Sequence, residues 1–312
     1  MLAIKARGGA LLTALFIMTL VAIVATAMST RLQVDIYRTK LIVMHDKLYL
    51  ASQAVTFWGL SELNNKQKTF TKLLKQGMVD QYPPKMAAIQ NQIKVSGGLY
   101  DLQAQFNLNN VLEKKSMTSF INLLHQAVPQ INNADATKLA QDVKDWISDY
   151  DPGKGKDDAT TYYLAQKPPY YPSHQFMLSK SELRLVKNVS ASIYLTLETF
   201  VTALPESTPI NINTASKQVL MSLGNGLHGE QVKELMTARA DGGIKDLKDI
   251  SALLKKLDLP EEQITIESQY FLNTAYASSD DFNLVVYSLM KRTHDKDKKL
   301  VVSIIGESIG SF

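Results

Sequence analysis

The N-terminal part of the chain begins as an uninterrupted apolar run. Residues 8–30 contain no charged residue and no proline. At about 1.5 Å per helical residue this run reaches about 34 Å, enough to cross a bilayer core of about 30 Å. The basic residues Lys5 and Arg7 precede it and would keep its start in the cytoplasm. The pattern therefore predicts a membrane-crossing helix close to the N-terminus.

A second pattern extends this helix. Apolar residues recur every three or four positions after the run, and charged residues fall between them. The members of this stripe are Val34, Tyr37, Leu41, Met44, Leu48, Ala51, Val55 and Trp58. No proline interrupts the segment, so one rod should continue to about Asn64, with an amphipathic outer half. We interpret the stripe as a subunit-contact surface, part of which must also pack on the protein's own domain. The alternative is an anchor that abuts a separate first domain helix.

Strands are predicted at both ends of the rest of the chain. Residues 92–95 and 99–106 alternate with period two across Ser96-Gly97-Gly98, which predicts a hairpin. Near the C-terminus three further strands are predicted, at residues 265–276, 282–292 and 299–306, with turns at 279–281 and 295–297.

Helical spacing dominates the region between these strands. The predicted helical segments are residues 116–128, 133–148 and 179–204. Asn133, Ser179 and Ser190 stand where N-terminal caps are expected.

These elements predict an α+β fold. A long transmembrane and amphipathic helix packs on an antiparallel sheet built from both ends of the chain, and a large all-α domain is inserted between. We divide the chain into a leader (1–8), a transmembrane helix (9–30), an amphipathic helix with the first strands (31–106), an inserted helical domain (107–263) and C-terminal strands (264–312).

The composition of the chain argues against nucleic-acid binding and against catalysis. The 34 Lys and Arg residues nearly balance the 30 Asp and Glu residues, so the net charge of +4 creates no strong field for nucleic acid. Cysteine is absent, which excludes disulfides and a cysteine nucleophile. The five histidines are scattered, and no phosphate-binding loop or metalloprotease motif occurs. We therefore predict no enzyme activity.

Three kinds of processing fit the N-terminus. A secretory signal peptide would be cut near Ala25-Thr26-Ala27, and a plain anchor would not be cut. The third kind cuts before the apolar run and keeps the helix. Residues 7–12, Arg-Gly-Gly-Ala-Leu-Leu, resemble that site as found in type IV pilins and their relatives.

Further segments extend this resemblance over nearly the whole chain. They are Phe106-Asn-Leu-Asn109, Asp145-Trp146-Ile147, Tyr162-Tyr163, Ser181-Glu-Leu-Arg-Leu-Val186, Pro209-Ile-Asn-Ile-Asn-Thr-Ala215 and Ser268-Gln-Tyr-Phe271. In this order they resemble the K subunits of the type II secretion pseudopilus, which are minor pseudopilins.

The resemblance implies how the N-terminus is processed. Prepilin peptidase would cut after Gly8, or after the neighbouring Gly9, and mature Gly9 would be N-methylated. The fifth mature residue is then Thr13, where ordinary pilins and pseudopilins carry a glutamate. A carboxylate within the membrane is costly unless it is paired. In ordinary subunits this carboxylate would pair with the N-terminus of a neighbouring subunit. A subunit at the tip has no subunit above it and needs no such ion pair, so Thr13 fits a tip position. The alternative is that Thr13 is an inert residue of an anchor helix.

The resemblance also implies partners and location. The expected partners are the minor pseudopilins I and J, the major pseudopilin and prepilin peptidase. The protein would cap the tip of the pseudopilus and support export of folded proteins across the outer membrane. It would cross the bacterial inner membrane once, with its C-terminal domain in the periplasm.

Two candidate sites lie in the inserted block. A glycine-bearing acidic loop could bind structural calcium, with Asp149, Asp151, Asp157 and Asp158 as ligands, and the resemblance supports this ion. Residues 209–254 resemble a helix-hairpin-helix (SAM-like) unit, which can hold a DNA phosphate. A membrane-anchored, competence-type DNA-binding protein is therefore the alternative function. Because the turn at 224–229 contains no lysine or arginine, we expect protein contacts and no nucleic acid there.

Overall fold

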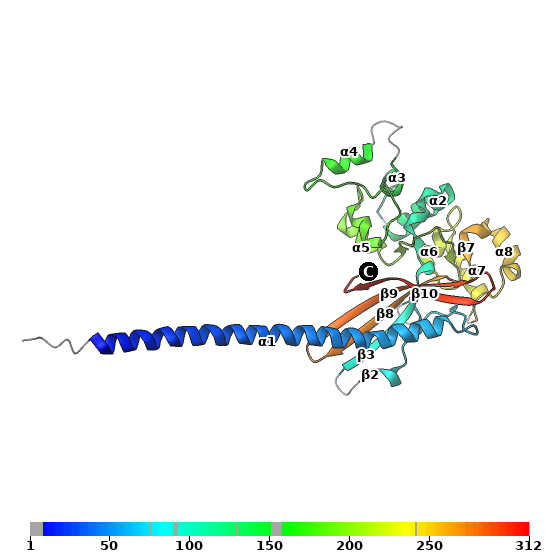
Figure 1. Cartoon of the computed structure of the whole chain (residues 1–312). Helices are drawn as coiled ribbons and strands as arrows, with labels where there is room; N and C mark the ends of the chain where they lie inside the picture. Colours follow the sequence, from blue (N-terminus) through cyan, green and yellow to red (C-terminus); the bar gives the residue numbers. More distant parts are fainter. Residues whose placement is uncertain are drawn as a thin grey trace, which may run out of the picture.

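The computed structural model describes residues 9–74, 77–89, 93–128, 130–150, 158–240 and 242–311. Helix α1 (Gly9–Leu63) is a single rod of 55 residues whose N-terminal half projects far beyond the globular part (Figure 1). The C-terminal turns of α1 lie on a sheet. The prediction of one continuous helix that ends near Asn64 is confirmed.

The main sheet has six antiparallel strands from both ends of the chain, as predicted. Their order is β1-β3-β8-β9-β10, and β2 also pairs with β3. The strands are β1 (Met78–Gln81), β2 (Ala88–Ile89), β3 (Ile93–Asp101), β8 (Tyr270–Ser279), β9 (Phe282–His294) and β10 (Leu300–Ile309). The three C-terminal strands and the turns between them are confirmed, except that β8 begins only at Tyr270.

The predicted hairpin across Ser96-Gly97-Gly98 is wrong. Strand β3 runs through these residues, and Gly97 is paired with Ala275 of β8. After Asp101 the chain leaves the sheet through a 3-10 turn. Two consecutive glycines suggested a turn, but here they allow close packing inside a strand.

The block between β3 and β8 is mainly helical. Its helices are α2 (Lys114–Ala127), α3 (Asn133–Ile147), α4 (Asp158–Leu164), α5 (Ala191–Leu197), α6 (Lys217–Ser222), α7 (Gly229–Arg239) and α8 (Ser251–Lys256). The expectation of an all-α block is corrected by two short parallel ladders. They pair β4 (Phe106–Asn107) with β5 (Val201–Thr202), and β6 (Ile210–Asn211) with β7 (Ile264–Thr265).

Short 3-10 helices complete the chain. They are η2 (Pro84–Met86), η3 (Leu102–Ala104), η4 (Leu108–Leu112), η6 (Lys180–Leu185), η7 (Leu247–Ile250) and η8 (Glu261–Gln263). The expected caps are confirmed at Ser179, which begins η6, and at Ser190, which begins α5. For α3 the cap is Asn132 and not Asn133, because the Asn132 side chain accepts from the Asp135 amide.

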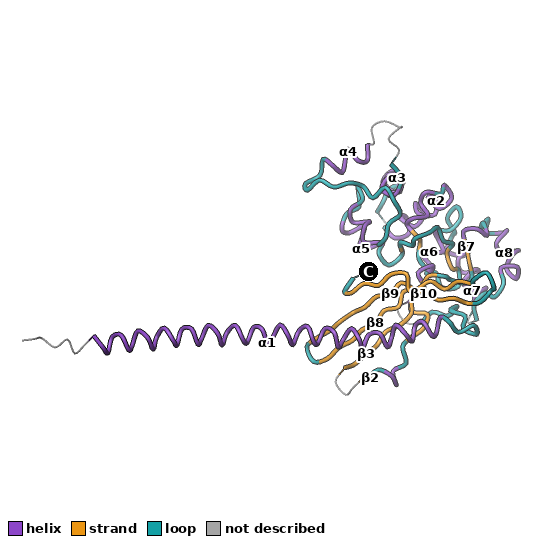
Figure 2. Tube along the Cα trace, viewed as in Figure 1, coloured by secondary structure: helices purple, strands orange, loops and turns teal. Residues whose placement is uncertain are grey.

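The strands of the main sheet lie between α1 and the helical block (Figure 2). The protein has two large hydrophobic cores. One core lies between α1 and the sheet, and includes Leu48, Val55 and Phe271. The other lies within the helical block, from Phe106 to Ile264. A small third cluster, Leu102, Leu204 and Tyr270, joins the block to the sheet.

Candidate assembly surfaces of the rod and the inserted block

The N-terminal half of α1 has no contact with the domain. Every residue from Gly9 to Thr30 is exposed. By length and composition α1 can cross a membrane, and its most apolar segment is not buried in the protein. This segment is therefore consistent with a single-pass anchor.

The hydroxyl of Thr13 forms its hydrogen bonds within its own helix. Its hydroxyl lies 3.1 Å from the Gly9 carbonyl oxygen and 3.0 Å from that of Ala10. A hydroxyl that donates to its own helix needs no partner within a membrane. Gly9 is the first residue of α1, and the other predicted cleavage residue, Gly8, lies outside the described residues.

The predicted contact stripe divides into two parts. Its first three members, Val34, Tyr37 and Leu41, are exposed, and Met44 is half-buried. Its last four members, Leu48, Ala51, Val55 and Trp58, are buried in this chain's own core. The assignment of these four residues as a partner surface is therefore corrected, because the sheet already covers them.

A different row of α1 remains uncovered on the face opposite the sheet. Ile36, Val43, Leu50 and Phe57 follow one another at intervals of seven residues. All four are exposed, Leu50 by 70% and Phe57 by 66%. We call these four residues the outward row. Large apolar side chains repeated at this spacing are typical of a helix that meets a parallel helix. This row was not predicted from the sequence, although its seven-residue interval can be read there.

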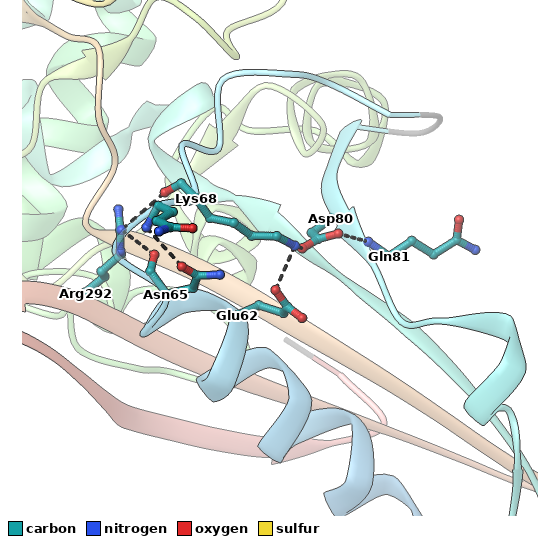
Figure 3. A network of polar contacts seen from close by, with 7 residues as sticks. Glu62, Asn65, Lys68, Asp80, Gln81 and Arg292 are labelled. Carbon is teal, nitrogen blue, oxygen red and sulfur yellow. Dashed lines mark hydrogen bonds and ion pairs between the residues drawn. The ribbon is translucent and has the colours of Figure 1, made fainter.

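The C-terminal end of the rod is fixed to the sheet by Arg292 of β9 (Figure 3). Its Nε atom donates to the Leu63 carbonyl oxygen at 2.9 Å. Nη2 lies 3.4 Å from the carbonyl oxygens of both Asn65 and Lys68. The guanidinium also lies 5.5 Å from the ring centroid of Phe70. A cation that binds the last carbonyls of a helix satisfies them and complements the helix dipole.

Lys68 adds a second connection beside this cap (Figure 3). Its ammonium pairs with Glu62 of α1 at 2.7 Å and with Asp80 of β1. Burial alone would lower the pKa of Lys68, but hydrogen bonds to the two carboxylates outweigh it and raise that pKa. The end of the rod is therefore bonded to two strands of the sheet, which makes rod and sheet one unit.

Asp101, at the end of β3, joins the sheet to the inserted block. Its carboxylate is buried and accepts hydrogen bonds from Thr214 at 2.6 Å, Ser268 at 2.7 Å and Asn211 at 2.9 Å. The Gln103 amide donates to its second oxygen at 2.8 Å. Burial raises the pKa of Asp101, and these donors partly oppose the rise. Two of the donors belong to the segment Pro209–Ala215 that supports the family resemblance.

The acidic loop is described only at its two ends. Asp149 and Asp158 lie at these ends, whereas Asp151 and Asp157 lie outside the described residues. His174 connects the ends, because its Nδ1 atom lies 2.9 Å from the Ser148 carbonyl oxygen and its Nε2 atom 3.1 Å from the Thr160 hydroxyl. Within the described part of the chain no group of three histidine or carboxylate side chains could hold a metal.

The turn between α6 and α7 presents few groups to an anion. Gly224 and Gly226 adopt left-handed φ angles of +59° and +96°. The amide of Gly224 donates to the Gln263 side chain at 3.3 Å. Arg239, at the end of α7, donates inward to three backbone carbonyls at 3.0 to 3.3 Å, those of Ile212, Asn213 and Ala215. Burial lowers the pKa of Arg239. This arginine therefore supports the fold and does not face solvent anions.

A membrane-length helix that continues onto an antiparallel sheet defines a pilin-like fold. The fold matches a chain in "The Crystal Structure of the GspK-GspI-GspJ complex from enterotoxigenic Escherichia coli Type 2 Secretion System", with a TM-score of 0.69 and 21% sequence identity. The match covers 88% of this chain and all of that one.

Sequence comparison identifies the family. Two models of "Type II secretion system (T2SS), protein K" match residues 104–206 and 210–267, about half of the chain. The type II secretion system protein K of Aeromonas hydrophila is 29% identical over 96% of both chains. That of Pseudomonas aeruginosa is 25% identical over 96% of this chain and 93% of its own. The chain belongs to the type II secretion system protein K family and is a minor pseudopilin.

Proposed function

We propose that this protein caps the periplasmic tip of the type II secretion pseudopilus together with the minor subunits I and J. In this position it would start filament assembly and support export of folded proteins across the outer membrane. Its anchor would lie in the inner membrane after prepilin peptidase has removed the leader. Family membership and the similarity to a chain from a GspK-GspI-GspJ complex support this proposal.

The observation that carries the proposal is the continuity of the rod. The same helix that can cross the membrane extends without a break onto the sheet, where Arg292 and Lys68 fix its end. Beside the sheet it still presents Leu50 and Phe57 to solvent. Parallel rods of neighbouring subunits would bury these side chains, and the major pseudopilin below would meet the same face.

The tip position is supported by Thr13 and by the inserted block. Thr13 carries no charge that a subunit above could pair with, and its hydroxyl is satisfied within its own helix. The block lies on the face of the sheet opposite α1 and makes the head much broader than the rod (Figure 1). A head of this breadth would obstruct the addition of a further subunit above it.

The test is co-purification of the full chain with subunits I and J from detergent extracts. Replacing Leu50 and Phe57 together by serine should reduce recovery of the complex about tenfold or more, since truncation of buried anchors costs over about 1 kcal/mol each. The matched control replaces Tyr171 and Leu195 by serine, which are comparably exposed in the inserted block and lie away from strand β10. Equal recovery of both variants, with unchanged helix content, would contradict the proposal.

We propose that the α6–α7 unit is a helix-hairpin-helix module for protein contacts and does not bind DNA. The inward-facing Arg239 and the occupied amide of Gly224 support this assignment. Binding of a labelled DNA duplex, followed by fluorescence anisotropy at two salt concentrations, tests it. A DNA affinity that falls steeply with salt would favour the competence-type alternative instead.

We propose that the acidic loop binds calcium. Exposed carboxylates are hard oxygen ligands, and His174 holds the two ends of the loop near each other. Calcium would stabilise this segment by neutralising its crowded aspartates. Titration calorimetry of the full chain with calcium, beside a variant with Asp149 and Asp158 changed to asparagine, should show a heat of binding that the variant loses.

A further inference from the structure

Strand β10 is an exposed edge of the main sheet. Among the described strands its neighbour is β9 alone, so the backbone groups of β10 that point away from β9 lack a strand partner. Proteins usually protect such an edge with charges, proline or a very short strand. β10 is ten residues long, has one charged residue, Glu307, and contains no proline, so its one protective feature is the irregularity of the ladder between Ile304 and Gly306.

One face of β10 continues the surface of α1. Ile304 and Ile309 lie on this face, because their partners across the ladder, Met290 and Val286, belong to the core under α1. Glu307 lies between them and accepts a hydrogen bond from the Tyr49 hydroxyl of α1 at 2.7 Å. Ile304 is 40% exposed and Ile309 47% exposed. A neighbour packed along the rod therefore meets apolar side chains of β10 directly.

The other face of β10 borders a groove. The groove has a volume of about 830 Å³ and lies between the strand and the segment 177–184 of the inserted block. Leu178, Leu289 and Ile305 contribute apolar walls. An extended segment paired with β10 would point alternate side chains into this groove and toward α1. Apolar residues would therefore be favoured on both of its faces.

Arg184 gives the groove a positive charge. Its guanidinium lies 5.7 Å from the ring centroid of Tyr194, and no carboxylate in the described part of the chain forms an ion pair with it. The other cation of the groove, Lys291, is already paired with Glu206 at 2.7 Å. An acidic side chain on the added strand would therefore find a partner in Arg184.

A second copy of this chain does not fit the edge. Antiparallel pairing of two β10 strands requires a two-fold axis perpendicular to the sheet, which reverses every direction within the sheet plane. Because α1 packs flat on β3, β8 and β9, the two rods would then point in opposite directions. Two copies anchored in one membrane cannot adopt that arrangement.

We propose that β10 accepts an extended strand from a neighbouring subunit of the filament tip. The strand is apolar on both faces, carries a carboxylate opposite Arg184 and extends the main sheet by one strand. Backbone hydrogen bonds provide the affinity, and the groove provides the specificity. This inference rests on the proposed function, since the neighbour is a subunit held beside the same rod.

Hydrogen exchange of the full chain in detergent, alone and in the co-purified complex, tests the strand pairing. Amides of residues 301–309 that point away from β9 should exchange at least tenfold more slowly in the complex. Strand β1, at the opposite edge of the sheet, is the internal control and should not change. An intact complex with unchanged exchange in β10 overturns this inference alone, whereas failure of any complex to form overturns the proposed function with it.

Two substitutions sharpen the test. Ile305→Lys places a charge at the edge and should weaken the complex about tenfold. Met86→Lys, at a somewhat more exposed site near the opposite edge, should not. A photo-reactive benzoylphenylalanine at position 305 should cross-link to a neighbouring subunit within an extended segment. Cross-linking to a second copy of this chain, or equal effects of both lysine substitutions, would overturn the proposal.

Discussion

Gly97 of β3 lies directly beneath Val55 of α1. A β-carbon built at Gly97 would lie 2.8 Å from the Cγ1 atom of Val55 and 2.1 Å from the Thr274 carbonyl oxygen of β8. Real β-carbons do not approach other atoms this closely. Because Gly97 has no side chain, α1 can pack closely against the sheet.

Gly97→Ala should destabilise the domain by about 3 kcal/mol or more, because the clash involves backbone as well as a buried side chain. Urea unfolding of the full chain in detergent measures the change. Gly229→Ala is the matched control, since a β-carbon there would meet nothing within 4 Å. A loss of stability at position 229 as large as that at position 97 would contradict this explanation.

Leu48 and Leu50 are two residues apart on α1 and have opposite roles. Leu48 is 2% exposed in the core under the rod, whereas Leu50 belongs to the outward row. Leu48→Ala should therefore cost about 2–5 kcal/mol of unfolding free energy. Leu50→Ala should change it by no more than about 0.5 kcal/mol. If both substitutions were equally costly in the isolated protein, the outward row would not be a free surface.

Arg292→Lys should weaken the attachment of the C-terminal end of α1 to the sheet. A lysine ammonium cannot donate to three separate carbonyl oxygens with the planar geometry of a guanidinium. We expect a loss of about 1–3 kcal/mol and faster proteolysis between residues 64 and 74. Arg38→Lys, on the exposed part of α1, provides the control, and its effect should stay within about 0.5 kcal/mol. Unchanged proteolysis in the Arg292 variant would exclude the capping role.

Asp101 predicts a pH dependence of stability. Burial raises its pKa above the ordinary value of 3.8, so above about pH 4 the folded state holds this proton more tightly than the unfolded state does. The contribution of Asp101 to stability therefore falls as pH rises from that point.

The comparison variant is Asp101→Asn, which does not titrate. Its amide nitrogen cannot accept the bonds from Thr214 and Ser268, so the variant should be less stable by about 1–3 kcal/mol. The difference between wild type and variant, measured by urea unfolding from about pH 4 to about pH 8, should shrink as pH rises. A difference that grows with pH would mean that the folded pKa is lowered.

The sequence alone predicted the features that depend on local periodicity. The continuous helix ending at Leu63 and the strand pair β9–β10 follow from patterns within a few residues of each position. The family resemblance also rested on local segments. These features agree with the structure because their hydrophobic spacing and their turns favour the same elements.

Features that depend on distant residues could not be predicted in this way. Arg292 binds Leu63, which lies 229 residues earlier in the chain. A pair of glycines looks the same in a turn as in a strand crossed by a helix, so Gly97 was assigned to a hairpin. Amphipathic spacing likewise predicts that Leu48 is buried, but it does not say whether a sheet of the same chain or a partner subunit buries it.

The N-terminus of the protein extracted from the cell envelope tests the central claim most directly. Sequencing together with intact mass determination should find a mature chain that begins at Gly9 or, with the alternative cut, at Ala10, carries one N-methyl group and retains the whole rod. A chain that begins at Met28 would lack the membrane segment of α1. That result would contradict the assignment of this protein to the tip of a membrane-anchored filament.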